Sequence, residues 1–245
     1  MKSPRQAIIF AAGLGTRLQP VTHSIPKALI EVAGKPMLRH VIEKLLAAGV
    51  RKIVINLHHF PELIGNYLRG QNNFGANIQF SDETGQLLDT GGGLKKAAAL
   101  FDPDFPVVIH NVDVISGIDL NRFYQYHLTS GSLATLFVQK RPSSRYLIFD
   151  EDRQLTGWKN TKTGEVIQAT TPRGNTEELA FNGIHIVNPE IFQLMTENGK
   201  FSIIPTYLRL ASQHKIIGFQ DDTVPYIDIG KPESLAEAEK LFFEI

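Results

Sequence analysis

The most informative stretch of the chain is Ala11-Ala12-Gly13-Leu14-Gly15-Thr16-Arg17-Leu18-Gln19-Pro20. It follows the run Ala7–Ala12, which is apolar throughout and predicts a buried strand. Glycine lets a loop turn tightly, and the backbone N–H groups of such a loop can cradle phosphate oxygens. Arg17 adds a forked, permanently charged donor for polyphosphate, and Lys27 follows as a second cation. The pattern indicates a phosphate-binding loop, with a plain solvated turn as the alternative.

Two other glycine motifs do not account for this loop. The dinucleotide fingerprint G-x-G-x-x-G would place its third glycine at Leu18. The Walker A motif needs Gly-Lys followed by serine or threonine, whereas Gly34-Lys35 is followed by Pro36. A phosphate site here would therefore be of another kind.

Outward from the loop, strands and helices alternate through the first half of the chain. Such alternation predicts an α/β protein, Rossmann-like, with three α/β/α layers around a mostly parallel mixed sheet. The strands are expected at Ala7–Ala12, Ile53–Leu57, Ile78–Phe80 and Val107–His110, and the helices from Pro36 to Gly49 and at Pro61–Leu68 and Leu94–Leu100.

After about residue 130 the pattern becomes richer in strands. No linker and no internal repeat divides the chain, and no hexapeptide β-helix repeat follows the closing helix. We therefore expect a single domain without a C-terminal β-helix domain. Strands are expected at Leu133–Val138, Tyr146–Phe149, Leu155–Trp158, Leu179–Val187, Lys215–Phe219 and Tyr226–Ile229, and helices at Pro189–Thr196, Ile203–Ser212 and Pro232–Phe243.

The amino-acid composition limits which classes of partner we expect for the protein. The 245 residues include 25 Lys and Arg and 25 Asp and Glu, so the formal net charge is zero. This balance argues against nucleic acid or anionic lipid as a partner. The chain has no cysteine, which excludes disulfides, cysteine-ligated zinc and a cysteine nucleophile, and suits the cytoplasm. No apolar run approaches the roughly 20 residues of a membrane span, so we expect no membrane segment.

The glycine-rich loop closely resembles the signature of sugar-phosphate nucleotidyltransferases. Gly13 to Thr22 resembles G-x-G-T-R-(L/M)-x-P-x-T, and Pro26-Lys27-Ala28-Leu29 resembles the P-K-x-(L/M) that follows it. Gly34-Lys35-Pro36-Met37 is similar to the family's G-(K/R)-P-(M/L). The resemblance implies the nucleotide-diphospho-sugar transferase fold, with residues 1–130 as the nucleotide-binding half and residues 131–245 as the half that binds the sugar phosphate.

The resemblance also implies roles within the loop. Arg17 would hold the β- and γ-phosphates, and Lys27 would stabilise the charge that develops on the α-phosphate. The acceptor phosphate would attack in line, with catalysis by positioning and charge neutralisation. The resemblance places the nucleotide against the backbone of Ala12, Gly13, Gly15 and Thr16.

A second glycine cluster, Asp89-Thr90-Gly91-Gly92-Gly93-Leu94, precedes a predicted helix. Three glycines alone more often form a flexible turn. The L-x-T-G-G-G form, however, resembles the family segment that faces the nucleobase in uridylyl- and guanylyl-transferring members. It implies that Thr90, Gly91 and Gly92 bind the nucleotide.

Two aspartates are candidates for a magnesium site. Asp113 follows the strand Val107–His110, and ligands of open α/β sheets gather beyond the carboxyl ends of strands. Asp228 lies in Tyr226-Ile227-Asp228-Ile229-Gly230, which resembles the family segment whose aspartate completes the metal site. Each aspartate alone would more often be a turn or capping residue. The family usually has Gly-Asp where this chain has Val112-Asp113. The resemblance implies Mg²⁺ bound by Asp113 and Asp228, with Asp113 also catalytic.

Three residues are candidates for binding the sugar phosphate. Asn182 and Gly183 resemble the family's N-x-G-I segment, which contacts the sugar, although an isolated glycine in a strand often marks a bulge. Lys159 partly matches a family lysine that holds the acceptor phosphate.

These expectations leave the substrates open. The chain most resembles short bacterial enzymes that act on N-acetylmuramate 1-phosphate with UTP or on mannose 1-phosphate with GTP. Alternatives are a catalytically idle sugar-nucleotide sensor and an enzyme that uses phosphocholine with CTP, although choline recognition favours an aromatic cage that the sequence does not specify. Monomer and homodimer are both compatible with the sequence.

Overall fold

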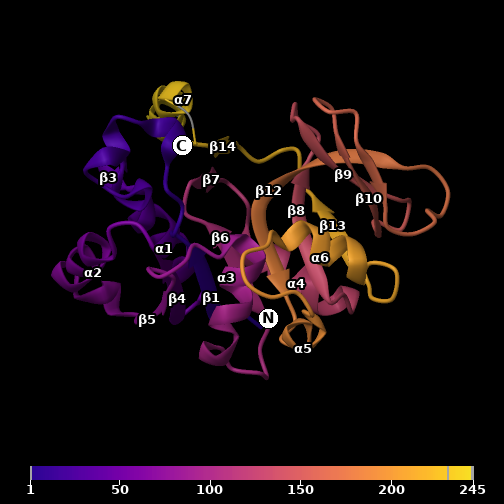
Figure 1. The fold of residues 1–245 in the computed structure, drawn as a ribbon, viewed down its shortest axis with the longest axis horizontal. Coiled ribbons are helices and arrows are strands. Elements are labelled where there is room, and N and C mark those ends of the chain that lie inside the picture. Colours follow the sequence, from indigo (N-terminus) through magenta and orange to yellow (C-terminus); the bar gives the residue numbers. More distant parts are fainter. Residues whose placement is uncertain (1, 231, 244–245) are drawn as a thin grey trace.

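The computed structural model describes residues 2–230 and 232–243. Its centre is a mixed sheet of ten strands in the order β11-β10-β9-β12-β6-β1-β4-β5, with β8 paired to β12 and β13 paired to β8 (Figure 1). The strands are β1 (Gln6–Phe10), β4 (Lys52–Leu57), β5 (Asn77–Asp82), β6 (Val107–Asn111), β8 (Ala134–Gln139), β9 (Arg145–Phe149), β10 (Leu155–Asn160), β11 (Val166–Gln168), β12 (Glu177–Val187) and β13 (Ile216–Gln220).

Strand β1 is central and lies parallel to both of its neighbours. Phe10, its last residue, is level with Asn56 of β4 and Asn111 of β6. The carboxyl ends of these strands therefore meet at one edge of the sheet. The loops that leave this edge begin at Ala11, His58 and Val112.

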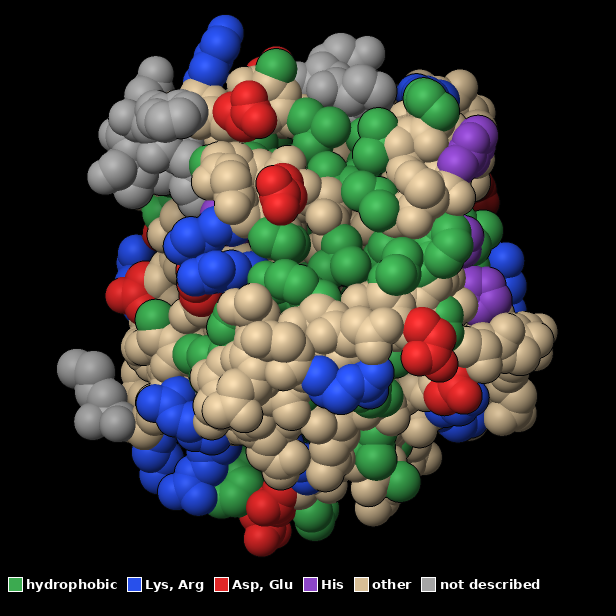
Figure 2. Space-filling model, turned by 90° about the vertical axis from the view of Figure 1, so that its left-hand side faces the viewer, with side chains coloured by type: hydrophobic (Ala, Val, Ile, Leu, Met, Phe, Trp, Pro, Cys, Tyr) green, Lys and Arg blue, Asp and Glu red, His purple; other side chains and the backbone are tan. Residues whose placement is uncertain are grey.

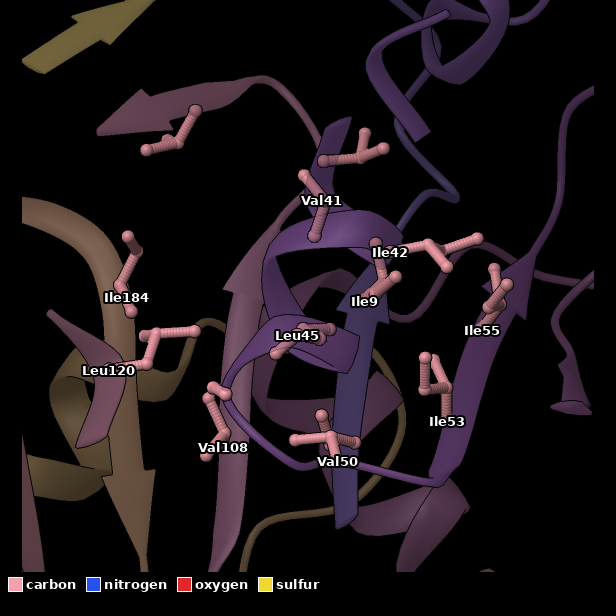
Figure 3. Packing of buried hydrophobic residues seen from close by; sticks show 14 of the residues in the cluster. Ile9, Val41, Ile42, Leu45, Val50, Ile53, Ile55, Val108, Leu120 and Ile184 are labelled. Carbon is pink, nitrogen blue, oxygen red and sulfur yellow. The ribbon is translucent and has the colours of Figure 1, made fainter. Parts of the chain in front are cut away.

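Side chains of β1 and β4 alternate between two buried clusters, one on each face of the sheet. Ile9, Ile53 and Ile55 pack on one face against the helices α1 and α2 and against α4, as Figure 3 shows for part of this cluster. Ile8 and Val54 pack on the other face against α3, α5 and α6. Helices therefore cover both faces, and the predicted three-layer α/β/α arrangement is confirmed. The helices are α1 (Met37–Ala47), α2 (Pro61–Gly70), α3 (Asp89–Ala97), α4 (Leu120–Ser130), α5 (Ile191–Leu194) and α6 (Ile203–Leu210).

Three helices differ most from expectation. Helix α4 was not predicted, and its N-terminus is capped by Asp119, which accepts from the backbone N–H groups of Asn121 and Arg122. Helix α3 begins at Asp89 rather than at Leu94, so the glycine cluster lies within its first turns. Helix α5 covers only Ile191–Leu194 of the predicted Pro189–Thr196.

Short strands bring the end of the chain back to the loops at the sheet edge. Strand β14 (Tyr226–Asp228) pairs antiparallel with β7 (Val114–Ser116), with Asp228 opposite Val114. Helix α7 (Pro232–Phe243) follows and lies beside the small hairpin of β2 (Glu31–Val32) and β3 (Lys35–Pro36) (Figure 1). Residues 113 and 228 become neighbours in this way, although more than a hundred residues separate them in sequence.

Charges of both signs occur on the face shown in Figure 2, which is the left-hand side of Figure 1. Apolar side chains gather in a band across the upper half of this view, and basic and acidic side chains both occur around that band. In the part of the chain that the structure describes, no helix is both long enough and apolar enough to cross a bilayer.

Candidate active site

A cleft of about 410 Å³ opens at the carboxyl edge of the sheet. Its walls come from the ends of β1, β4 and β6, from the glycine-rich loop and from the start of α3. The predicted site residues that line it are Ala12, Gly13, Gly15, Thr16, Arg17, Lys27, Thr90 and Asp113. The structure brings these eight positions together, and their roles in binding stay predictions.

The glycine-rich loop is anchored where it leaves β1. The buried side chain of Asn56 accepts hydrogen bonds from the backbone N–H groups of Ala11 (2.6 Å) and Ala12 (3.2 Å). The same amide donates to the buried carboxylate of Glu83 at 2.8 Å, and Glu83 also accepts from Leu88 N at 3.0 Å. The network links β4, the loop and the start of α3, and it fixes the direction in which the loop enters the cleft.

Lys27 and Asp113 form an ion pair at the floor of this cleft. The Lys27 side chain is 9% exposed and that of Asp113 is 22% exposed, so the pair is mostly withdrawn from water. Arg17, by contrast, is exposed, and it has no hydrogen bond or ion pair among the residues whose side chains the structure describes. One cation is therefore held in place by an acid, and a second lies exposed in the cleft.

Gly91 and Gly92 do not line the cleft, and their expected role in nucleotide binding stays a prediction. Their backbone N–H groups both donate to the carbonyl of Phe201, at 2.9 and 3.2 Å. A Cβ at Gly91 would collide with the Phe201 ring, and one at Gly92 would collide with the carbonyl of Gly199. These glycines are needed because the backbone at 199–201 packs closely on the first turns of α3. Only Thr90 of the three predicted residues reaches the cleft.

Asp113 and Asp228 fit the requirements of a magnesium ion. Ile229 N donates to the Asp113 carbonyl at 3.0 Å, which holds the two segments side by side. One carboxylate oxygen of Asp113 contacts Lys27, and one of Asp228 accepts from Gly230 N at 2.7 Å. Each aspartate therefore keeps an oxygen for a metal, and Mg²⁺ commonly takes one or two carboxylates together with substrate phosphates and water. Among the described residues, no group of three or more His, Cys, Asp or Glu could hold a metal by itself.

A second cleft, of about 610 Å³, adjoins the first. Arg17, Asn111 and Asp113 line both clefts, so the two meet at the end of β6. Its other walls come from the segment at 141–147, from β10 and β12, and from Tyr226 and Asp228 of β14. The site thus has two compartments with a common wall that carries both charge signs.

Asn182 does not present its side chain to this second cleft, contrary to expectation. It is fully buried, accepts from Arg141 Nε at 2.8 Å and donates to Gln139 at 3.0 Å. Gly183 does line the cleft. It has a φ of 70° within a β-bulge of β12, and a Cβ there would lie 2.5 Å from the amide nitrogen of Asn111. Glycine is required for both reasons, and the bulge alternative for this position is confirmed.

Lys159 is also placed away from the second cleft. Its ammonium group forms an ion pair with Glu178 at 2.8 Å, with both side chains partly exposed. The neighbouring Trp158 lines the cleft, but Lys159 does not. The ammonium group is thus paired with an acid outside the cleft, and the expected role of Lys159 in holding the acceptor phosphate stays a prediction.

Val112 occupies the position where the related signature usually has glycine. Its side chain is buried in the cluster that includes Ile9 and Val108, and its N–H donates to the carbonyl of Phe10 at 3.1 Å. The backbone that leads to Asp113 is therefore held by packing and by a hydrogen bond to β1. This packing accommodates the valine and leaves Asp113 in the cleft.

Burial shifts the pKa values of two ionisable side chains near the wall that the two clefts share. Burial raises the pKa of Tyr226 above its usual value, while the nearby Arg141 guanidinium opposes the rise, so the phenol stays protonated. Burial lowers the pKa of His110 to about 4, so this imidazole is neutral at pH 7. Neither of these two side chains therefore adds a charge to the site at pH 7.

Several residues that line the clefts were not predicted from the sequence. Asn56 and Glu83 lie at the ends of expected strands without a motif, and the cations Lys200, Arg141 and Arg145 lie in loops or at a strand end. For Asn56 and Glu83, a polar residue at the carboxyl end of a predicted parallel strand was a usable signal. Nothing in their local sequence distinguishes the three cations from solvated residues.

The fold and the two joined clefts define a nucleotide-handling enzyme of the α/β class. Residues 6–244 match the nucleotidyl transferase family, and the chain belongs to that family. It is 32% identical to the N-acetylmuramate alpha-1-phosphate uridylyltransferase of Caulobacter vibrioides, over 97% of both chains. It is 29% identical to the mannose-1-phosphate guanyltransferase of Pichia angusta, over 97% of this chain but only 64% of that relative.

Solved structures agree on the fold. HddC from Yersinia pseudotuberculosis complexed with GMP-PN superposes with a TM-score of 0.76 at 24% identity, over 97% of this chain and 99% of that one. A putative glucose-1-phosphate thymidylyltransferase from Bacillus anthracis gives 0.79 at 19% identity, over 99% of this chain and 96% of that one. The protein is therefore a nucleotidyltransferase of the sugar-phosphate class, and the expected fold is confirmed.

Proposed function

We propose that this enzyme transfers a uridylyl group from UTP to N-acetylmuramate 1-phosphate or a related hexose 1-phosphate, with Mg²⁺. The observation that carries the proposal is the common wall of the two clefts, formed by Arg17, Asn111 and Asp113. One compartment suits the nucleotide, the other suits the acceptor, and the Lys27–Asp113 pair lies where they meet.

The charged side chains suggest how the transfer proceeds. Lys27 would contact the α-phosphate, and the exposed guanidinium of Arg17 would hold the β- and γ-phosphates. An oxygen of the acceptor phosphate forms a new bond to the α-phosphorus, and the bond from that phosphorus to the bridging oxygen of the β-phosphate breaks. The electron pair leaves with pyrophosphate, which Arg17 stabilises, so no covalent enzyme intermediate is needed.

Asp113 and Asp228 would hold the magnesium ion. Bound there, Mg²⁺ would neutralise charge on the phosphate oxygens. The other residues of the site would act by positioning. The Asn56–Glu83 network holds the glycine-rich loop in place, and the pairing of β14 with β7 holds Asp228 beside Val114.

UTP and an N-acetylmuramate acceptor are preferred because the uridylyltransferase relative is matched over 97% of both chains. GTP with mannose 1-phosphate is the second candidate, since relatives named for that reaction match 97% of this chain at 29% identity. The idle-sensor alternative receives no support from the cleft, where Arg17, Lys27 and both aspartates are all in place.

Removal of the charged groups tests the proposal. Lys27→Ala, Arg17→Ala and Asp113→Ala should each lower kcat by roughly 10²- to 10³-fold, as the loss of a transition-state charge contact does elsewhere. Lys35→Ala is the matched control, because Lys35 is paired with Glu43 outside both clefts and should keep normal turnover. Circular dichroism shows whether each variant is folded. Normal turnover in the three folded site variants would contradict these role assignments.

A further inference from the structure

Besides Arg17, the acceptor cleft carries two arginines four residues apart, Arg141 and Arg145, on either side of the turn at 142–144. Neither is part of the motifs that relate this chain to its family. The acids that line the same cleft are Asp113 and Asp228. Asp113 is already paired with Lys27, so the wall at 141–145 presents positive charge with no acid of its own.

Arg141 is a fixed part of this wall. Its Nε donates to Asn182 at 2.8 Å, and one terminal nitrogen donates to the Phe181 carbonyl at 3.0 Å. Its guanidinium lies over the Tyr226 ring, 4.2 Å from the ring centroid. The buried Asn182 therefore orients an arginine rather than contacting the sugar itself. Terminal N–H groups of Arg141 remain for a ligand.

Arg145 has a fixed backbone and a free side chain. Its N–H donates to the Ser143 hydroxyl at 3.2 Å, and that hydroxyl donates to its carbonyl at 2.9 Å. Tyr146 supports the same turn, since its hydroxyl accepts from Ser143 N at 2.8 Å. The Arg145 guanidinium itself has no hydrogen bond or ion pair with any residue that the structure describes. A charged side chain that is exposed in a cleft and anchored only at its backbone is available to a ligand.

We propose that Arg145, beside the fixed guanidinium of Arg141, binds an anionic group of the acceptor, in the place that the family pattern gives to a lysine. The inference rests on the proposed function, because it concerns the acceptor compartment of the same site. Two guanidinium groups present planar sets of donors, which suits the oxygens of a phosphate or a carboxylate better than a single ammonium group does. Lys159, which is paired with Glu178, takes no part.

Steady-state kinetics of three variants tests the assignment. Arg145→Ala should raise the KM for the sugar 1-phosphate by roughly 10- to 100-fold, the loss expected for one charged hydrogen-bonding contact. The KM for the nucleoside triphosphate should change less than twofold. Arg145→Lys should recover part of the loss. Lys159→Ala is the matched control, because it removes a nearby cation whose partner is a surface acid, and its acceptor KM should equal that of the wild type.

A comparison of two acceptors, one with and one without a sugar carboxylate, shows whether Arg145 binds the phosphate or the carboxylate. If Arg145 binds the phosphate, Arg145→Ala weakens N-acetylmuramate 1-phosphate and N-acetylglucosamine 1-phosphate equally. If it binds the sugar carboxylate, only the muramate acceptor is weakened. Either pattern supports the proposal. An unchanged acceptor KM in Arg145→Ala, or an increase confined to Lys159→Ala, overturns it.

Calorimetric titration of the acceptors separates this inference from the proposed function. If the wild-type protein binds a sugar 1-phosphate but shows no turnover, only the proposed function is contradicted. Weaker binding to Arg145→Ala than to Lys159→Ala would then support the assignment. Equal binding to both variants, or no binding of either acceptor to the wild type, would overturn it.

Discussion

Asn56→Ala should both destabilise the protein and weaken nucleotide binding. The Asn56 side chain is 3% exposed and makes three hydrogen bonds, two from the loop backbone and one to Glu83. Removing it leaves three buried polar groups without this partner. At about 1 kcal/mol for each group, the free energy of unfolding should fall by about 3 kcal/mol. The KM for the nucleoside triphosphate should rise at least about tenfold, because the loop then loses its anchor.

Gln6→Ala is the matched control at the opposite end of β1. Gln6 is 1% exposed and also makes three hydrogen bonds, to the backbone of Asp102 and Phe105. It should lose similar stability without a change in nucleotide KM. Urea unfolding, with the slope m unchanged, measures the stability difference, and pyrophosphate release measures KM. An equal KM for the two variants, or a stable Asn56→Ala with normal KM, would refute the reasoning.

Two further predictions concern packing and pH. Gly91→Ala should lower the unfolding free energy by about 1–3 kcal/mol, because its Cβ would overlap the Phe201 ring, whereas Gly85→Ala, with open space around its Cβ, should be nearly neutral. Thermal unfolding measures both. Burial lowers the pKa of His127 from 6.5 to about 4, so the unfolded chain binds the proton first as the pH falls. Protonation of His127 therefore does not lower the free energy of unfolding above pH 6.5. Between pH 6.5 and about pH 4, the free energy of unfolding falls by about 1.4 kcal/mol for each pH unit.

Each of these predictions has a clear contrary result. A Gly91→Ala protein as stable as Gly85→Ala would show that the segment at 199–201 does not need its close contact with α3. For His127, the stability difference between the wild type and His127→Gln should shrink as the pH falls from 6.5 to 4. A constant difference would contradict the lowered pKa.

Much of the parallel half of the fold could be predicted from periodicity. The apolar run at Ala7–Ala12 covers all of β1 except Gln6, and the apolar spacing from Met37 to Leu46 covers most of α1. Helix α4 was missed because aromatic and polar residues alternate in it as Phe123-Tyr124-Gln125-Tyr126-His127, which blurs the apolar stripe. Its Asp119 cap was a readable signal.

The site was predictable where the chain itself forms it and not where distant segments meet. The loop residues Gly13 to Arg17 lie together because they are consecutive. The close contact of Gly91 and Gly92 with the backbone at 199–201 could not be predicted, because that segment lies more than a hundred residues away in sequence. The same limit applies to the cations of the acceptor cleft, since sequence does not show that Glu178 engages Lys159 while Arg145 stays free.

The most direct test of the central claim is pyrophosphate release by the wild-type enzyme with Mg²⁺. UTP, GTP, CTP, ATP and dTTP would each be paired with the 1-phosphates of N-acetylmuramate, mannose, glucose and N-acetylglucosamine, and phosphocholine would be included with CTP. We expect one strongly preferred pair, UTP with N-acetylmuramate 1-phosphate, and loss of its turnover when EDTA removes the metal. Folded protein that releases no pyrophosphate with any pair would contradict the account.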